Sequence, residues 1–117
     1  MTGMDAFETT ALIGAAALPL AHEIVQDDQR VSGEPATGLV ELGTFGGLEI
    51  GVWEMTTGAM TDVEADELFV VVAGRATIAF EASGVVLAIG PGDIVRLTEG
   101  DRTTWTVTET LRKVYLT

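Results

Sequence analysis

The fold is decided by residues 67–81, which read ELFVVVAGRATIAFE. In the second half of this stretch, Ala76, Ile78 and Phe80 alternate with other residues, which is the two-residue period of a strand with one buried face. Residues 68–72 are apolar on both faces, so we expect this strand to be covered twice, by the core and by another sheet or subunit. We therefore predict two strands, at 67–73 and 75–82, separated by Gly74.

Short apolar runs punctuated by glycine extend this pattern along the chain. The sequence Gly90-Pro-Gly-Asp93 has proline at the second and glycine at the third turn position, as a type II turn requires. In residues 103–108 the alternation places Trp105 on an inward face. The spacing is typical of a β-sandwich or barrel, and the expected strands are 38–45, 48–56, 67–73, 75–82, 85–89, 93–98, 103–108 and 111–116.

The N-terminal part has a different texture. Residues 5–18 are rich in alanine and leucine, begin with the capping-box pattern of Asp5 and Glu8, and end before Pro19, which predicts a short helix. A polar stretch from His22 to Gly38 predicts an extended connector on the surface. We therefore divide the chain into residues 1–35, a helix and connector, and residues 36–117, a compact antiparallel β domain.

Composition limits the partners. Eighteen acidic and six basic residues give a formal charge of −12, which repels phosphate backbones and anionic lipids, so we expect neither nucleic acid nor a membrane as partner. The chain has no cysteine, which fits a reducing compartment. Residues 9–21 are apolar but too short to span a bilayer, and acidic residues precede them where a signal peptide needs basic ones. A cytoplasmic location is therefore expected.

Several fragments together resemble a known family. The run from Glu67 to Gly74, followed about twenty residues after Glu67 by Gly90-Pro-Gly-Asp93, resembles the two motifs of the cupin superfamily. The wider context is similar to its cupin-3 branch, which includes ureidoglycine aminohydrolase-like and ethanolamine-utilisation proteins. The further matching fragments are Gly51-Val-Trp-Glu-Met55, Asp62-Val-Glu-Ala-Asp-Glu67, Trp105-Thr-Val107 and Leu111-Arg-Lys-Val-Tyr115. The resemblance covers about residues 36–117 and implies an all-β fold, a double-stranded β-helix or jelly-roll barrel, that is often a homodimer.

The resemblance also implies where a metal would sit. In metal-binding cupins a His-x-His pair precedes a glutamate, and the second motif adds another histidine. Glu67 falls on the glutamate position, and the histidine positions fall on residues without imidazole: Thr61 and Val63, or Met60 and Asp62 with the longer spacing, and Thr103. A histidine-ligated metal is therefore not expected as a cofactor. The alternative is an oxygen-ligated divalent cation held by Asp62, Glu64 and Glu67, which would suit manganese, magnesium or calcium.

The interior residues predict a ligand site. A buried Glu67 needs a hydrogen-bonding or cationic neighbour, for which Arg96 is the leading interior residue, although its strand position would equally allow it to point outward. Trp53 and Trp105 either line a pocket or belong to the core. His22, the only histidine, could act as a base only if the N-terminal segment folded over the barrel mouth, and otherwise is exposed.

Three functions remain open at this point. The first is a metal-free cupin that binds a small polar molecule through Glu67, Thr103, Trp105 and, with them, Arg96 and Trp53. The second is an enzyme acting on a small nitrogenous compound, with Glu67 as acid or base beside the oxygen-ligated metal. The third is a dimeric structural module that uses the doubly apolar strand 68–72 and the N-terminal helix.

Overall fold

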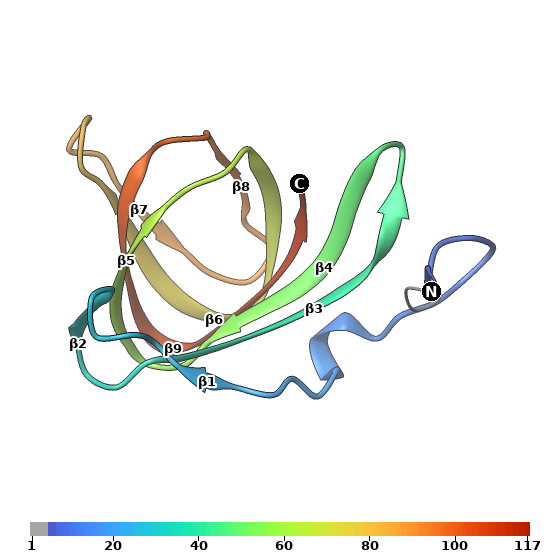
Figure 1. Ribbon diagram of the computed structural model, residues 1–117, viewed down its shortest axis with the longest axis horizontal. Coiled ribbons are helices and arrows are strands. Elements are labelled where there is room, and N and C mark those ends of the chain that lie inside the picture. Colours follow the sequence, from blue (N-terminus) through green and yellow to red (C-terminus); the bar gives the residue numbers. More distant parts are fainter. Residues whose placement is uncertain (1–4) are drawn as a thin grey trace.

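The computed structural model describes residues 5–117, in which nine β-strands and one 3-10 helix are formed. The elements are η1 (Ala15–Ala17), β1 (Glu23–Ile24), β2 (Arg30–Ser32), β3 (Ala36–Phe45), β4 (Leu48–Met55), β5 (Gly58–Val63), β6 (Glu67–Phe80), β7 (Val86–Ile89), β8 (Ile94–Leu97) and β9 (Arg102–Leu116). Figure 1 shows the sheet curled into a barrel, with the β3–β4 hairpin extending away from its rounded part. The all-β barrel predicted from the sequence is confirmed.

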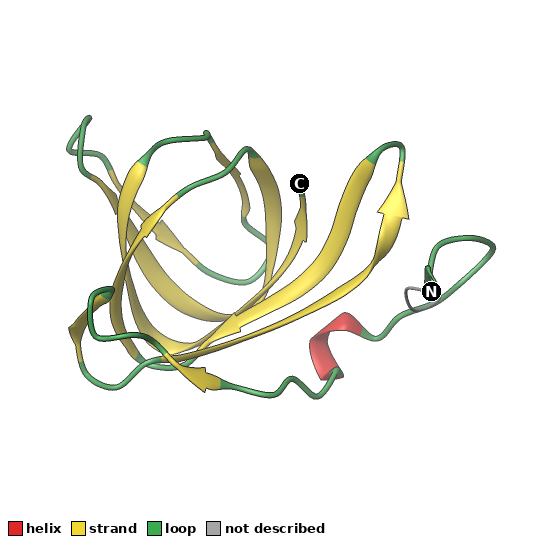
Figure 2. Cartoon of the chain, in the orientation of Figure 1, coloured by secondary structure: helices red, strands yellow, loops and turns green. Residues whose placement is uncertain are grey.

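The two longest strands, β6 and β9, organise the sheet. They pair antiparallel along most of their length, with Val70 opposite Val114 and Ile78 opposite Trp105. The first half of β9 also pairs with β5 and its second half with β4, while β6 pairs with β7 and β8 on its other edge. Both strands therefore bend around the barrel, and each of their halves lies in a different part of the wall (Figure 2).

The core follows the predicted alternation. Trp105 is 1% exposed, and Phe69 and Ile78 are fully buried. The side chains of Thr103, Trp105 and Val107 share the inward face of β9, as expected. Burial of these large apolar groups supplies most of the driving force for closing the barrel.

Two pairs of predicted strands prove to be continuous. The strands expected at 67–73 and 75–82 form the single strand β6, and those expected at 103–108 and 111–116 form β9. Register shifts separate the two halves of β6, and Gly74 lies there with a φ of +89°, in a conformation that glycine adopts without strain. A Cβ at Gly74 would collide with the backbone carbonyl of Thr110. The strand β5 was not predicted, because its polar C-terminal end continues into an acidic stretch.

The predicted N-terminal helix over residues 5–18 is wrong, since the only helix in the described part of this segment is the 3-10 turn η1. The Asp5 carboxylate does not cap a helix: it accepts hydrogen bonds from the backbone N–H of Phe7 and from the N–H and hydroxyl of Thr44 on β3. Leu12 is 91% exposed, so a helix here would have no apolar face to bury. Residues 5–117 contain no helix long and apolar enough to cross a bilayer.

Candidate functional site

A cavity of about 360 Å³ lies against the inner side of the sheet, between the β3–β4 hairpin, β9 and the start of β6. The charged groups of its lining, among the described residues, are five carboxylates and one ammonium group. The carboxylates belong to Glu41, Glu49, Asp62, Glu64 and Glu67, and the ammonium group to Lys113. The rings of Trp53, Trp105 and Tyr115 form the remaining large surfaces of the wall.

Lys113 and Glu67 form a buried ion pair in this cavity. The Nζ atom of Lys113 lies 2.6 Å from Oε2 of Glu67, and the side chains are 7% and 18% exposed, respectively. The same Nζ stands over three aromatic rings, at 4.4 Å from the centroid of Phe69, 4.7 Å from Trp53 and 4.9 Å from Trp105. Ring faces attract cations, so these contacts and the carboxylate fix the ammonium group in one place.

Glu64 is held by two hydrogen bonds from β9. Its Oε2 accepts from the hydroxyl of Thr103 at 2.6 Å and from the indole N–H of Trp105 at 2.9 Å. The strand β5 ends at Val63, and the link between β5 and β6 directs Glu64 to the interior, where it is buried.

Two groups of the wall have shifted pKa values. Burial, reinforced by the negative charge of Glu64, raises the pKa of the Asp62 carboxyl. Burial also raises the pKa of the Tyr115 hydroxyl, together with the charges of nearby glutamates. Both raised pKa values show that the wall of the first cavity disfavours further negative charge. Asp62 and Trp53 also line a second cavity of about 300 Å³.

The residues predicted for the site are distributed unequally. Trp53, Trp105 and Glu67 line the cavity, with the two indole centroids 5.4 Å apart, and Thr103 is buried behind Glu64. Of the two orientations that the sequence left open for Arg96, the structure has the outward one, so Arg96 is not the interior partner of Glu67. Its side chain is 62% exposed and pairs with Asp66, because the inward positions of β8 are those of Val95 and Leu97.

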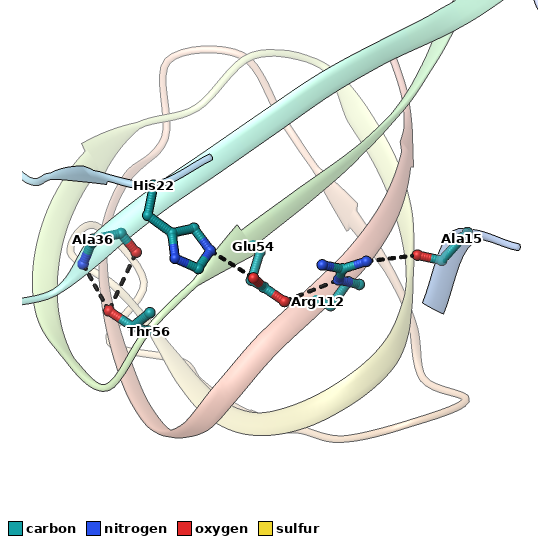
Figure 3. Close-up of polar contacts among 6 residues, drawn as sticks. All are labelled: Ala15, His22, Ala36, Glu54, Thr56 and Arg112. Carbon is teal, nitrogen blue, oxygen red and sulfur yellow. Dashed lines mark hydrogen bonds and ion pairs between the residues drawn. The ribbon is translucent and has the colours of Figure 1, made fainter. Parts of the chain in front are cut away.

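His22 lies on the opposite face of the sheet from the cavity. The N-terminal segment runs along the outside of β3 and does not cover the barrel mouth (Figure 1). Figure 3 shows the contacts that attach it: Nε2 of His22 lies 2.6 Å from Oε2 of Glu54, and Arg112 bonds both Glu54 and the backbone carbonyl of Ala15. Burial alone would raise the pKa of Glu54, but the hydrogen bonds from Arg112 and His22 outweigh it and lower that pKa.

Lys113 is the site residue that the sequence prediction missed. In residues 111–116 the positions of Leu111, Lys113 and Tyr115 share one face, the face that proves to be buried. This alternation was a usable signal, and so was the fact that Lys113 is the only lysine of the chain. Neither signal was used, because a lysine is normally assigned to the surface.

The residues present do not fit the metal centre that the family resemblance implies. Met60 and Asp62, the pair with the longer spacing, face inward, whereas Thr61 and Val63 are exposed. No three of the histidine, aspartate and glutamate side chains among residues 5–117 are grouped so that they could hold a metal ion. The carboxylate of Glu67 is already paired with the ammonium group of Lys113, which would repel a cation.

Comparisons with known proteins agree with the geometry. The family model described as an EutQ-like cupin domain matches residues 42–115. The EutQ protein of Clostridium difficile is similar in structure, with a TM-score of 0.61 and 19% identity over 80% of this chain and 78% of that one. A putative ethanolamine utilization protein Q from Salmonella typhimurium gives a TM-score of 0.60 and 15% identity, over 84% and 95% of the two chains.

A protein of unknown function of the DUF861 family from Pseudomonas syringae gives a TM-score of 0.66 and 26% identity, covering 86% of this chain and 44% of that one. A comparison with curated proteins finds no significant match. The solved structures therefore support the fold and leave the activity open.

Proposed function

The chain belongs to the family of EutQ-like cupin domains, and on this premise we propose that its barrel binds a small polar molecule without a histidine-ligated metal ion. The observation that carries the proposal is the cavity of about 360 Å³ with the Lys113–Glu67 pair in its wall. A concave site with large aromatic surfaces and a few fixed polar groups is the usual form of a small-molecule site.

The polar groups of the cavity indicate which hydrogen-bonding groups the ligand carries. Oε2 of Glu64 accepts two hydrogen bonds and Oε2 of Glu67 accepts one, all of 2.9 Å or less, and Oε1 of each residue remains available as an acceptor. Five carboxylates disfavour anions. Hydroxyl or amino groups on a compact ligand would donate to the carboxylates while its apolar side stacks against Trp53.

Calorimetry against polyols, sugars, ureides and small amines tests this proposal. A ligand that binds should lose about tenfold or more in affinity on Trp53→Ala, because it loses a stacking surface. The matched control is Asp66→Asn, which removes a carboxylate outside the cavity and should leave binding unchanged. Binding that survives Trp53→Ala, or that requires added divalent metal and disappears with chelator, contradicts a metal-independent cavity site.

We also propose that the chain forms a homodimer through the outer face of β6 and β8. Leu68 and Ile94 lie on this face, 43% and 66% exposed, and apolar side chains of Leu48 and Leu116 line an adjoining depression. Light scattering should show a dimer that Leu68→Asp weakens, and a monomeric native chain at micromolar concentration contradicts it. The cytoplasmic location stays a prediction, which cell fractionation can test.

A further inference from the structure

The one lysine of the chain is buried in the cavity. All five other basic residues are arginines, and the side chain of Lys113 is 7% exposed. Lysine is strongly hydrated and among the residues least often buried. Lys113 lines the cavity, so its primary amine lies where an entering molecule meets it, and no other lysine competes for that molecule.

The amine has a proton acceptor at contact distance. Oε2 of Glu67 lies 2.6 Å from Nζ, within reach for proton transfer. The rings of Phe69, Trp53 and Trp105 surround the same nitrogen and stabilise a positive charge on it. These contacts favour the ammonium form, so Lys113 becomes a nucleophile only when Glu67 takes its proton. A carbonyl compound held in the cavity would then meet a primary amine, the group that forms Schiff bases.

We infer that Lys113 condenses with a small aldehyde or ketone to form an imine, with Glu67 as the proton carrier. Glu67 takes a proton from the ammonium group, and the freed electron pair of Nζ attacks the carbonyl carbon. One of the two protons left on nitrogen moves to the former carbonyl oxygen, which gives a carbinolamine whose nitrogen keeps the other proton. Glu67 returns its proton to the hydroxyl group, which leaves as water while the nitrogen electron pair forms the C=N bond.

The balance of this step suits its surroundings. One carbonyl compound and one ammonium group give one protonated imine and one water, with no oxidant or reductant. The protonated imine keeps the positive charge at the same place, where Glu67 and the three rings stabilise it as they stabilise the ammonium group. The inference rests on the proposed function of the cavity and names the class of its ligand.

The wall selects among carbonyl compounds. Its carboxylates oppose anionic keto acids and accept hydrogen bonds from hydroxyl groups. The pKa of Asp62 in this wall is raised by burial and by the charge of Glu64, which shows that a negative charge is unfavourable there. The ligand class is therefore an uncharged, hydroxyl-bearing aldehyde or ketone small enough for about 360 Å³.

Reductive trapping on the full-length chain tests the inference. The protein is incubated with glycolaldehyde and sodium cyanoborohydride, and labelled sites are quantified by peptide mass spectrometry. The variant Arg96→Lys supplies an internal reference, since it places a second lysine at an exposed position outside the cavity. Lys113 should be labelled about tenfold or more faster than the introduced lysine, because the cavity holds the aldehyde beside Nζ and because Glu67 and the rings stabilise the protonated imine. Labelling of Lys113 that is absent, or slower than the reference, overturns the inference.

Two further comparisons sharpen the result. In the double variant Glu67→Gln/Arg96→Lys, labelling of Lys113 should slow about tenfold or more while the reference lysine is unaffected; equal rates would overturn the role of Glu67. Relative to the same reference, the anionic aldehyde glyoxylate should label Lys113 less than glycolaldehyde does; the reverse order would overturn the ligand class. The main comparison uses the native cavity, so no core variant has to fold.

Calorimetry with glycerol separates this inference from the proposed function. Glycerol carries hydroxyl groups but no carbonyl group. If glycerol binds and glycolaldehyde does not label Lys113, the cavity remains a binding site and the imine is refuted. If neither happens, both the inference and the binding of this ligand class are refuted.

Discussion

Replacing Lys113 by methionine removes the one ammonium group among the described residues that line the cavity. Methionine has about the same length and no charge, so the packing against Trp53, Phe69 and Trp105 is largely kept. The Glu67 carboxylate then loses its cationic partner at 2.6 Å. The substitution therefore isolates the electrostatic part of the interaction.

The magnitude follows from the burial of the pair. Breaking a buried ion pair from one side costs about 3–5 kcal/mol, and because the Glu67 side chain keeps 18% of its exposure we expect the lower end, about 3 kcal/mol. With an unfolding entropy of about 2.1 cal/mol/K per residue over 117 residues, this lowers Tm by about 12 °C. Glu67→Gln should cost only about 1 kcal/mol, since the ammonium group keeps the three rings and an amide acceptor.

Urea unfolding followed by circular dichroism at pH 7 measures these differences. The double variant Lys113→Met/Glu67→Gln should be more stable than Lys113→Met alone, with a coupling energy of about 1.5 kcal/mol or more. The reasoning is that a buried carboxylate left without its cation destabilises the fold more than an ammonium group left without its carboxylate. It would be refuted if the two single costs added up in the double variant, or if Lys113→Met cost no more than Glu67→Gln.

Three further results are expected. Asp62→Asn should raise the free energy of unfolding at pH 7 and leave it unchanged below about pH 3.9, because the penalty of the raised pKa sets in as the pH rises above the ordinary aspartate value; urea titrations at several pH values measure this. Glu54→Gln should lower the free energy of unfolding by about 1 kcal/mol at pH 7. Because the pKa of Glu54 is lowered in the folded chain, this contribution should be lost as the pH drops below about 4.3. Thermal melts from pH 3 to 7 measure the difference, and a cost that does not depend on pH would contradict the ion-pair explanation. Gly74→Ala should lower the free energy of unfolding by about 2 kcal/mol or more, because φ is +89° there and the added Cβ meets the carbonyl of Thr110. The control Gly84→Ala should cost less, because φ is also positive at Gly84 but the added Cβ meets no atom.

Local sequence patterns determined most of the fold. The two-residue alternation around Ile78 and Trp105 placed those side chains inward, and the glycine-punctuated runs gave the strands of an all-β barrel. These predictions succeeded because side-chain alternation is a property of the strand itself and needs no knowledge of the partner strand.

The N-terminal segment shows where local patterns failed. Its alanines, its leucines and the positions of Asp5 and Glu8 favour a helix, but Asp5 bonds Thr44, thirty-nine residues away, and no apolar face is buried by a helix there. Helix propensity is weak and competes with tertiary contacts that a sequence window does not contain.

For the candidate site too, the sequence indicated some residues and only the tertiary structure decided others. The sequence by itself indicated Glu67, Trp53 and Trp105 as barrel residues, and it has no histidine at the positions where the family resemblance implies metal ligands. Only the tertiary structure decided which cation Glu67 meets: Arg96, on the neighbouring strand β8, turns outward, and Lys113, forty-six residues away on β9, turns inward. Pairing between strands far apart in the sequence brings Glu67 and Lys113 together. The burial of their charges depends on all the strands around them, which no local stretch of sequence contains.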